Sequence, residues 1–422
     1  METEICIIGA GPAGLMGAIF AALRPAQRVA QAGARTMVIE ANATAGRKLL
    51  LTGGGRCNFT HQATGEETAR AFGRKGKFLS YCLHEFPPQG VRQFFHRRGL
   101  ESKVDQAGCV FPVTDRASDV RDILSAEAKR RGVRFMFSTK VQNVTKPGHH
   151  FAVKTAGQII QAEKLIIATG GLSYPDTGST GDGFRFAQLF GHKIAEPRPS
   201  LAPLVTRQSW PGDLAGTALE NVKMSTSIGK KKIIVTGAML FTHDGIGGPA
   251  VLQLSRFVTD FLPSEKIPLE VLVDLVSDIG EVELERMILK QVSDHPKKAL
   301  VSILAEFVPR RVAQVLCEQF NLAGGLYANQ LGADLRRRLL HLLKAVPFSI
   351  VRTRPIAEAM VTRGGVDVAQ VDPKTMESKI CPGLFFAGEI LDADGPCGGY
   401  NLHLCWSTGA LAGLSAANAV QS

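Results

Sequence analysis

The sequence predicts an α/β protein in which a nucleotide-binding domain is interrupted by an inserted domain of strands and helices. Three observations carry this prediction. Between residues 4 and 40 the chain reads as a strand, a glycine turn, a helix and a second strand, which is the order of a βαβ unit. Two close prolines in Glu196-Pro197-Arg198-Pro199 then indicate a domain crossing. Near Val361 the pattern of strands and glycine turns returns.

The composition is that of an ordinary globular protein. Its 422 residues are enough for two or three domains, because a domain usually holds about 100–200 residues. Charged residues make up 21% and aromatic residues 7%, which excludes disordered and collagen-like classes. The net charge is 49 − 38 = +11, with Lys230-Lys231-Lys232 and Arg336-Arg337-Arg338 as the longest basic runs. Such a charge favours anionic partners, although a soluble enzyme of high isoelectric point is the interpretation that we favour.

The cysteines and the N-terminus indicate the compartment. None of the eight cysteines forms a C-x-x-C pair, so we expect neither a zinc ribbon nor another metal site. Scattered cysteines of this kind fit a reducing compartment. The first four residues contain two glutamates and no basic residue, and the apolar stretch over 9–23 is too short to span a bilayer. We therefore expect a cytoplasmic protein without a membrane partner.

Periodicity predicts the elements of the first part of the nucleotide-binding domain, residues 1–196. The expected helices cover residues 13–23 and 118–131, the second with Ser118 as its N-cap. Expected strands are short apolar runs at 4–8, 36–40 and 133–138, a hairpin at 151–155 and 159–162, and a separate buried strand at 164–168.

The inserted domain is expected over residues 197–360, and the second part of the nucleotide-binding domain over 361–422. The insert begins with strand-like runs within residues 200–275, at 202–206, 222–228, 232–236 and 269–275, and closes with strand-like residues over 345–360. Helical patterns fill the region between them, over residues 281–344, at 281–292, 298–307, 311–320 and 330–343.

The first glycine turn carries a dinucleotide-binding pattern. Gly9, Gly11 and Gly14 form G-x-G-x-x-G directly after a strand and at the start of a helix, which is the context that the motif requires. These glycines permit the tight turn, the approach of a pyrophosphate and close helix–strand packing, and the helix N-terminus attracts phosphate. Glu40 lies 40 − 14 = 26 residues further on and is expected to accept hydrogen bonds from ribose hydroxyls. The alternative is a structural glycine turn with a solvated Glu40.

Two further segments indicate which dinucleotide binds. Residues 46–48 and 52–58 combine three cations with a glycine turn, an arrangement that can wrap a pyrophosphate and reach a flavin ring. Residues 164–171 form a buried strand that runs into Ala168-Thr169-Gly170, which two-glycine flavoproteins often place beside their cofactor. A solvated basic loop and an ordinary strand turn are the respective alternatives.

A third segment lies near the C-terminus. An apolar strand ends in Gly388-Glu389, Asp392 follows, and Gly398-Gly399 opens a helix. The helix N-terminus could aim N–H groups at the N1/C2 edge of a flavin, where reduced flavin carries negative charge. The alternative is an ordinary C-terminal βα unit.

With these motifs in order, the chain resembles the YhiN/BaiN-like flavoproteins, also known as the aminoacetone oxidase family of FAD-binding enzymes. The resemblance extends over nearly the whole chain. The matching stretches are residues 9–14, 46–50, 53–58, 168–171, 240–245, 248–250, 364–366, 374–378 and 387–402. The chain departs from the family pattern at Ala238, Gly247, Cys397, His403 and Cys405, and residues 25–33 resemble an insertion.

The resemblance implies a two-dinucleotide-binding Rossmann-type FAD domain, interrupted by a β-barrel-like and helical insert. It also implies FAD as cofactor and a flavin-dependent redox activity, similar to enzymes that reduce conjugated enones of bile-acid-type steroids with a nicotinamide reductant. The expected FAD contacts are Gly9, Gly11, Pro12, Ala13, Gly14, Glu40, Arg47, Lys48, Gly54, Gly55, Arg56, Cys57, Val141, Ala168, Thr169, Gly170, Gly388, Glu389, Asp392, Gly399, Asn401 and Leu402.

The flavin itself exchanges the hydride at N5, so no side chain has to be a nucleophile. His243 and Tyr400 are the candidates for orienting the substrate or supplying a proton, and a structural role is the alternative for each. No second G-x-G-x-x-G stands in a strand–helix context, so NAD(P)H would dock transiently at the flavin. The alternative is an oxidase reaction, in which an organic substrate supplies the electrons to the flavin and oxygen accepts them.

Three functional classes follow. The first is a cytoplasmic FAD-dependent oxidoreductase that acts on a small or steroid-like molecule, with NAD(P)H as reductant and no nucleic-acid partner. The second is an FAD-dependent tRNA-modifying enzyme, which the positive charge favours. The third is a flavin-binding sensor without turnover.

Overall fold

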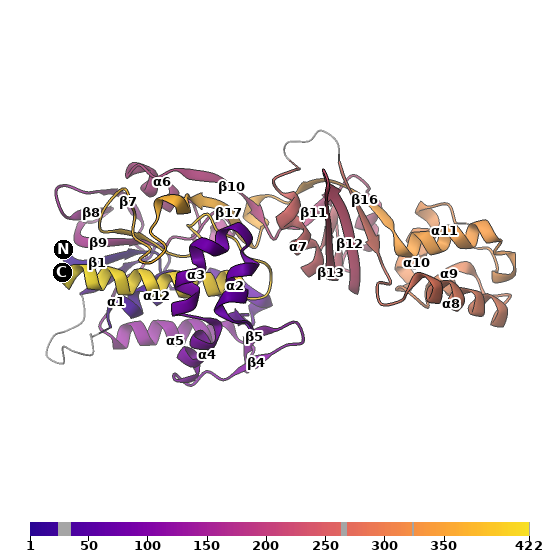
Figure 1. The fold of residues 1–422 in the computed structure, drawn as a ribbon, viewed down its shortest axis with the longest axis horizontal. Coiled ribbons are helices and arrows are strands. Elements are labelled where there is room, and N and C mark those ends of the chain that lie inside the picture. The colour runs from indigo at the N-terminus through magenta and orange to yellow at the C-terminus, as the bar shows by residue number, and fades with distance from the viewer. Residues whose placement is uncertain (24–34, 263–267, 323–324, 422) are drawn as a thin grey trace. The chain divides into compact units, whose positions relative to one another are not determined.

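The computed structural model describes all residues except 24–34, 263–267, 323–324 and 422. The stretch over 25–33, interpreted above as an insertion, therefore lies outside the described residues. The chain divides into two compact units. The first unit contains Met1–Arg198 and Ile356–Ser422, and the second contains Pro199–Pro355 (Figure 1).

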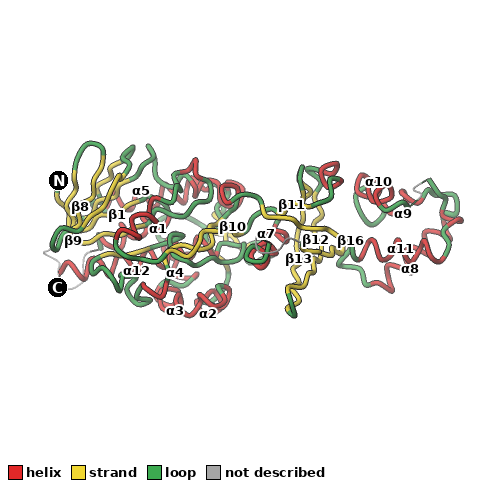
Figure 2. Tube along the Cα trace, turned by 90° about the horizontal axis from the view of Figure 1, so that it is seen from above, coloured by secondary structure: helices red, strands yellow, loops and turns green. Residues whose placement is uncertain are grey.

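A mostly parallel sheet forms the centre of the first unit (Figures 1 and 2). Its strand order is β6-β2-β1-β9-β8-β7, and β18 pairs with β9. All pairs among β6, β2, β1, β9 and β18 are parallel, whereas β7 and β8 are antiparallel to their neighbours. The bounds are β1 Glu2–Ile8, β2 Thr36–Ile39, β6 Arg134–Met136, β7 Val141–Thr145, β8 Phe151–Thr155, β9 Ile159–Ile167 and β18 Leu384–Phe386.

The expected hairpin strand over 159–162 and the expected separate strand over 164–168 are one strand, β9. The prediction of a break between them was wrong. Glu163 and Lys164 are only half-buried. In the sequence, this polar pair indicated the end of one strand and the start of another. The ladder continues through it because β1 pairs with β9 on both sides of the polar pair, while on the other edge of β9 the partner changes from β8 to β18.

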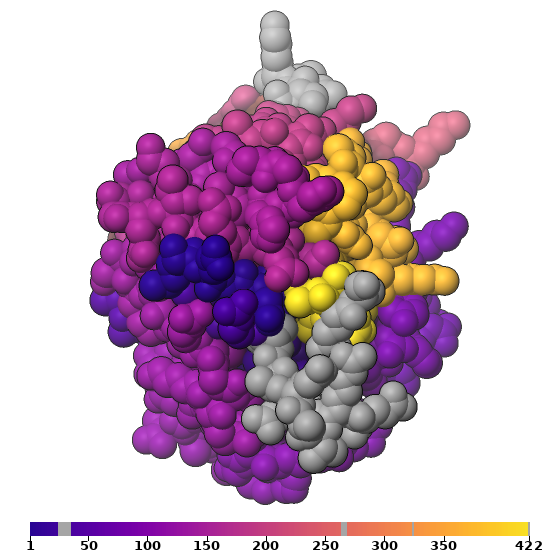
Figure 3. Space-filling view, turned by 90° about the vertical axis from the view of Figure 1, so that its left-hand side faces the viewer, coloured from indigo at the N-terminus to yellow at the C-terminus, as the bar shows by residue number. Residues whose placement is uncertain are grey.

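Two helices from opposite ends of the chain pack closely beside this sheet. They are α1 (Pro12–Ala21) and α12 (Tyr400–Gln421). A Cβ on Gly413 would lie 2.1 Å from the Gly17 oxygen, and a Cβ on Gly409 would lie 2.4 Å from the Ala13 oxygen. Only glycine permits this approach of the two backbones. The two ends of the chain accordingly reach one face of the first unit (Figure 3).

The remaining elements of the first unit surround this core. β3 and β4 pair with β5 in a small antiparallel sheet, and β10 pairs with β17. The bounds are β3 Thr60–His61, β4 Ser102–Val104, β5 Cys109–Pro112, β10 Ile194–Ser200, β17 Val361–Val366, α2 Gly65–Ala71, α3 Gly76–Glu85, α4 Pro88–His96, α5 Ala117–Arg130 and α6 Asp182–Leu189.

The predicted N-cap of α5 was wrong. The helix begins at Ala117, its N-cap is Arg116, and no side chain caps it. Ala117 is 3% exposed, so burial of this good helix former draws the start of the helix forward. Ser118 lies inside the first turn, where its hydroxyl faces Asp119 Oδ1 at 3.3 Å.

The second unit is a closed six-stranded barrel, with helices inserted in the chain between β14 and β15 and between β15 and β16. The strand order is β11-β14-β13-β12-β15-β16, and the buried side chains of Trp210, Phe241 and Phe348 lie in its core. The strands are β11 Leu204–Thr206, β12 Ala218–Ile228, β13 Lys231–Thr242, β14 Gly245–Gly247, β15 Leu269–Asp274 and β16 Val346–Thr353. The helices are α7 Pro249–Val258, α8 Glu281–Asp294, α9 Leu300–Leu304, α10 Arg310–Gln319 and α11 Ala333–Lys344.

This architecture confirms the predicted fold class, an α/β dinucleotide-binding fold with an inserted barrel and helices. Sequence patterns missed α7, and they predicted β12 and β13 to be shorter than they are. They also overestimated the helix predicted over 298–307, of which α9 covers only Leu300–Leu304. Within the described ranges, no helix combines the length and apolar character that crossing a bilayer requires.

Candidate cofactor-binding site

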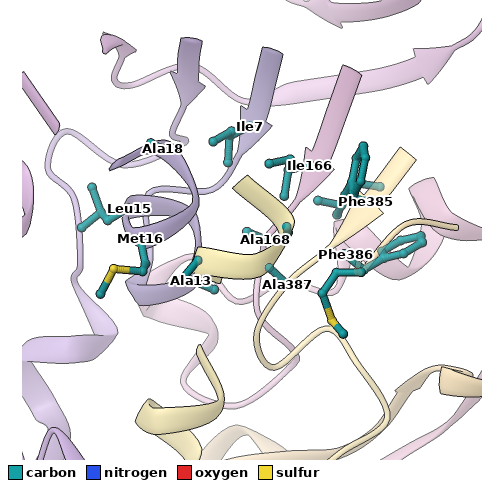
Figure 4. Packing of buried hydrophobic residues seen from close by; sticks show 14 of the residues in the cluster. Ile7, Ala13, Leu15, Met16, Ala18, Ile166, Ala168, Phe385, Phe386 and Ala387 are labelled. Atoms are coloured by element: carbon teal, nitrogen blue, oxygen red, sulfur yellow. The ribbon is translucent and has the colours of Figure 1, made fainter. Parts of the chain in front are cut away.

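Three parallel strands end side by side at one edge of the sheet. Ile8 of β1 and Phe386 of β18 both pair with Ile167 of β9. The loops that follow are the three glycine segments singled out in the sequence, at residues 9–14, 168–171 and 387–389. Figure 4 shows Ala13, Ala168 and Ala387 close together where these segments meet. Ligands of open α/β sheets bind outside the carboxyl ends of the strands, which makes this edge the candidate cofactor site.

The first glycine loop is shaped for close packing on one side and for a ligand on the other. A Cβ on Gly14 would lie 1.9 Å from the Gly9 oxygen, and Gly9 has φ +102°. A Cβ on Gly11, by contrast, would meet nothing within 4 Å. Helix α1 begins directly beyond it with Pro12 in its first turn and no side-chain cap, so its N-terminal N–H groups are available to an anion. This open space before an uncapped helix end fits a pyrophosphate.

Glu40 connects this loop to the end of β2. The side chain is 9% exposed, and its Oε2 accepts a hydrogen bond from the backbone N–H of Ala10 at 2.7 Å. Its Oε1 accepts from the backbone N–H and the side-chain Nδ2 of Asn42, at 2.8 and 2.7 Å. A carboxylate offers about four acceptor positions, so Oε2 retains capacity for one further donor. Binding of a ribose hydroxyl at this position stays a prediction.

Val141 lies near the same strand end. It is the first residue of β7 and is buried. Two residues earlier, the backbone N–H of Thr139 donates to the backbone carbonyl oxygen of Glu40 at 2.9 Å. The structure therefore places the chain entering β7 beside the end of β2.

Lys48 and Glu389 form a largely buried ion pair between the two parts of the first unit. Lys48 Nζ lies 2.7 Å from Glu389 Oε2, and the two side chains are 20% and 16% exposed. Glu389 Oε1 also accepts from Ser173 Oγ at 2.9 Å and from the Thr362 backbone N–H at 2.8 Å. Burial acts to raise the pKa of Glu389, but Lys48 and these donors outweigh it and hold the pKa below its ordinary value. Both side chains thus have partners within the protein, and their contact with FAD stays a prediction.

The other charged residues expected at the cofactor also have protein partners. Asp392 forms an ion pair with Lys75. Arg47 Nη1 donates to Asn42 Oδ1 at 2.8 Å. The Arg56 guanidinium lies 4.4 Å from the centroid of the Phe111 ring.

The glycine turn over residues 53–55 leaves free space beside two of its three glycines, Gly54 and Gly55. Gly54 has φ +66°, and a Cβ there would meet nothing within 4 Å, while the nearest atom to a Cβ on Gly55 is 4.0 Å away. The neighbouring Cys57 is fully buried, and burial raises the pKa of its thiol to about 12. Cys57 is therefore a neutral, packed side chain, and any contact with FAD would come through its backbone.

Thr169 supplies an unexplained polar group. Its Oγ1 is buried and finds no hydrogen-bond partner within the described part of the protein. Buried hydroxyls are almost always hydrogen-bonded, so a bound polar molecule is a natural partner for this one. Gly170, the next residue, has φ +74° and lets the chain turn away from the sheet edge.

The C-terminal segment forms a second tight turn. Gly399 has φ +93°, and a Cβ there would lie 2.3 Å from the Thr60 oxygen. The side chain of Asn401 spans the turn, because its Oδ1 accepts from the Gly395 N–H at 2.7 Å and its Nδ2 donates to the Gly395 oxygen at 2.9 Å. Asn401 thus shapes the turn with its side chain, and the half-buried Leu402 follows it in the first turn of α12.

His61 is a residue that the sequence analysis missed. Its Nδ1 lies 3.1 Å from the Gly398 oxygen, and its ring stacks on Tyr400 with centroids 4.7 Å apart. No pattern marks a single histidine at the end of a two-residue strand, so only the fold reveals it. Ser173, Thr362 and Lys75 were missed for the same reason.

The two predicted catalytic candidates belong to different units. Tyr400 is the half-buried first residue of α12 in the first unit, and burial raises the pKa of its phenol above the ordinary value. His243 is exposed in the turn between β13 and β14 of the barrel. Among the departures from the family pattern, His403 is 1% exposed and burial lowers its pKa to about 3, so it is neutral.

Comparison with known proteins adds three findings. The model of the family described as "HI0933-like protein Rossmann domain" matches residues 3–415. The 3-dehydro-bile acid delta(4,6)-reductase of Clostridium scindens is 30% identical over 98% of this chain and 99% of its own length. The ribosomal RNA dihydrouridine synthase of Escherichia coli is 31% identical over 96% of each chain.

Solved structures share the fold. The 3-ketosteroid delta1-dehydrogenase of Sterolibacterium denitrificans superimposes with a TM-score of 0.54 at 13% identity, over 99% of this chain and all of the other.

Proposed function

The chain belongs to the HI0933-like Rossmann-domain family of flavin-dependent oxidoreductases, and from this premise we propose that it reduces a carbon–carbon double bond conjugated to a carbonyl group. FAD is its cofactor. In the proposal NAD(P)H is the reductant and the substrate is a small, steroid-like enone. The observation that carries it is the meeting of three glycine loops, from both ends of the chain, at one edge of a parallel sheet.

The names of the two relatives denote the same chemistry on different molecules. A delta(4,6)-reductase of a 3-dehydro bile acid saturates double bonds conjugated to the 3-oxo group. A dihydrouridine synthase saturates the bond between C5 and C6 of uracil, which is conjugated to the C4 carbonyl. Both reactions add a hydride to a carbon made electrophilic by conjugation to a carbonyl, the β carbon of an enone or the δ carbon of a dienone, and a proton then neutralises the resulting enolate. This shared reaction supports the proposed reaction type.

The residues at the sheet edge suit each part of the cofactor. The open face of Gly11 and the N-terminus of α1 would hold the pyrophosphate, and Glu40 would hold the ribose. The turn at Gly399 and the N-terminus of α12 would face the flavin. When bound, FAD supplies hydride transfer between a nicotinamide and the substrate. The positive end of α12 would stabilise negative charge on the reduced ring.

The substrate has two candidates. A bile-acid-type enone is the first, supported by the reductase relative, which matches 98% of this chain. A uridine in RNA is the second, favoured by the synthase relative at 31% identity and by the net charge of +11.

An anaerobic titration tests the proposal. We expect the purified protein to be yellow and to release FAD when it is denatured. NADH or NADPH should bleach the flavin spectrum, and a conjugated 3-oxo steroid should then restore it. Restoration by a uridine-containing RNA and not by the steroid would assign the second substrate. A colourless protein that releases no FAD would contradict the proposal.

Tyr400 is the proposed source of the proton for the α carbon. Burial raises the pKa of its phenol above the ordinary value, so the group remains protonated at neutral pH. We expect Tyr400→Phe to lower the rate of enone reduction by about 10² or more, the contribution typical of a general acid. Bleaching by NAD(P)H should be unaffected, because it needs no proton from this residue.

The pH dependence has a definite sign. The wild-type rate should fall as the pH rises through the raised pKa of Tyr400, because the phenolate cannot donate a proton. Tyr400→Phe should lack this alkaline fall, whereas the control Tyr81→Phe, at an exposed tyrosine of α3, should keep both the rate and the profile. An undiminished rate in Tyr400→Phe would rule out this role.

A further inference from the structure

We infer that the lysine-bearing hairpin of the barrel is a docking surface for single-stranded RNA. The surface is the end of the β12–β13 hairpin, with the lysines at its turn, the outward side chains next to the turn, and Phe257 of α7, which lies beside Lys231. The inference deepens the second substrate candidate and rests on it only in naming RNA as the partner. It assigns a role to the lysine run at residues 230–232, which the proposed reduction does not use.

The hairpin presents three lysines at its tip. Ser227 pairs with Lys232 and Ile228 pairs with Lys231, and Gly229 turns the chain with φ +57°. Lys230, Lys231 and Lys232 are all exposed. Within the described ranges of the chain, none of the three forms an ion pair with a carboxylate. Their charge is therefore available to an anionic partner.

The outward face of the hairpin continues the pattern of donors. Side chains alternate along a strand, and the inward positions Met224, Ile233 and Val235 are buried. The outward positions carry cations, hydroxyl groups and one isoleucine that is 49% exposed, and they are Lys223, Ser225, Ser227, Lys232, Ile234 and Thr236. Lysines and hydroxyl groups are the usual donors to nucleic-acid phosphates.

Two acidic residues of the neighbouring strand β15 border this face. Asp274 pairs with Lys223 across the ladder, but its Oδ2 lies 2.6 Å from Lys344 Nζ and is thereby neutralised. Glu270 is exposed at the other end of β15. Of the two β15 carboxylates, only that of Glu270 is not neutralised in this way, and it borders a hairpin that carries four lysines.

An exposed aromatic ring lies beside Lys231, which has the strand register of the inward residues Ile233 and Val235 but is exposed at the end of the hairpin. Phe257 is 39% exposed, and Lys231 Nζ lies 5.6 Å from the centroid of its ring. Surfaces that bind single-stranded nucleic acid combine cations that follow the backbone with aromatic rings on which bases stack. The relative named for ribosomal RNA aligns over 96% of this chain, a span that includes the barrel.

The test is the salt dependence of binding to a labelled single-stranded, uridine-rich RNA, measured by fluorescence anisotropy on the holoprotein. The test variant is Lys230→Ala/Lys231→Ala/Lys232→Ala. Its slope of log K against log salt should be shallower by about 2, because three lost phosphate contacts contribute about 0.7 each. Phe257→Ala should weaken binding by roughly tenfold and leave the slope unchanged, as loss of one stacked base predicts.

The matched control is Arg336→Ala/Arg337→Ala/Arg338→Ala on α11 of the same unit. It removes the same charge, but these arginines already bond to Glu285, Asp334 and the Phe320 oxygen. The control should keep the wild-type slope. Equal loss in both triple variants, no RNA binding by the wild type, or binding to anionic phospholipid vesicles in place of RNA would each overturn the inference.

The same variants separate the docking surface from the catalytic proposal. Flavin bleaching by NAD(P)H and reoxidation by an enone should be unchanged in the lysine variant. Loss of RNA binding with intact flavin chemistry supports the surface, whereas failed flavin chemistry in the wild type would reject the proposed function alone.

Discussion

The Gly14→Ala variant is expected to lose FAD and to unfold more easily than the wild type. Its new methyl group would lie 1.9 Å from the Gly9 oxygen, which belongs to the backbone and cannot move aside cheaply. The N-terminus of α1 would have to move away from the end of β1. Overpacking of this kind costs about 1–3 kcal/mol or more. The measurements are the flavin absorbance of the purified protein and its denaturant midpoint.

Gly11→Ala is the matched control for this prediction. A Cβ at Gly11 meets nothing within 4 Å and the residue has φ −73°, so the variant should fold as the wild type does. Its methyl group would nevertheless occupy the space assigned to the pyrophosphate and should weaken FAD binding by about tenfold, equivalent to about 1.4 kcal/mol. Unchanged FAD affinity in Gly11→Ala would show that the pyrophosphate lies elsewhere.

The second large effect is expected for Lys48→Met. This change leaves the carboxylate of Glu389 largely buried, at 16% exposure, without its cation. Removal of one member of a buried pair costs about 3–5 kcal/mol. Because this pair is partly exposed, we expect a loss of about 3 kcal/mol in the free energy of unfolding. The free energy of unfolding from urea titrations measures the loss.

The pH dependence and a double variant identify the cause. The pKa of Glu389 is lowered in the folded wild type, so its stabilising contribution is present above the unfolded pKa and is lost as the pH falls through the folded value. The difference between wild type and Lys48→Met should therefore shrink toward acidic pH. Lys48→Met/Glu389→Gln should recover part of the stability, since it removes both charges. A penalty that is independent of pH would point to lost packing instead.

A surface pair serves as the comparison. Arg286 and Glu283 on α8 are 2.6 Å apart, but their side chains are 73% and 47% exposed. Exposed pairs of this kind contribute little, because water screens the charges. Arg286→Met should leave the unfolding midpoint unchanged.

The variants at Gly14 and at Lys48 both test packing at the candidate cofactor site, where segments that are far apart in the sequence meet. Lys48 lies 341 residues from Glu389. A Cβ on Gly388 would lie 2.6 Å from the Cβ of Ala13 in α1. The loop after β18 therefore packs directly on α1, the first helix of the chain. These contacts bring segments from both ends of the chain together at the candidate cofactor site.

Local motifs explain why the sequence predicted the fold class and the family. The G-x-G-x-x-G turn, the strand that precedes it and the helix that follows are neighbours in sequence, and the backbone geometry of the turn requires glycine at Gly9 and Gly14. The domain crossing near Pro197 and the return near Val361 are likewise local changes of pattern. The fold class, the family and the assignment as a flavin-dependent oxidoreductase are confirmed.

Element boundaries were less predictable, because they depend on neighbours that the local pattern does not contain. β9 continues through the polar pair Glu163 and Lys164 because β1 pairs with it on both sides of that point, while β18 replaces β8 on its other edge. α5 starts at Ala117 because the core buries that residue, not because Ser118 can cap.

The sequence by itself determined that a dinucleotide-binding turn opens this chain and that its C-terminus supplies a second glycine turn. Only the tertiary structure decided which charged residues remain for a ligand. It paired Lys48 with Glu389 and Lys75 with Asp392, and it placed His61 against Tyr400. The physical reason is that a motif records backbone requirements over a few residues. The partner of a buried charge is set by which distant segments the sheet brings together.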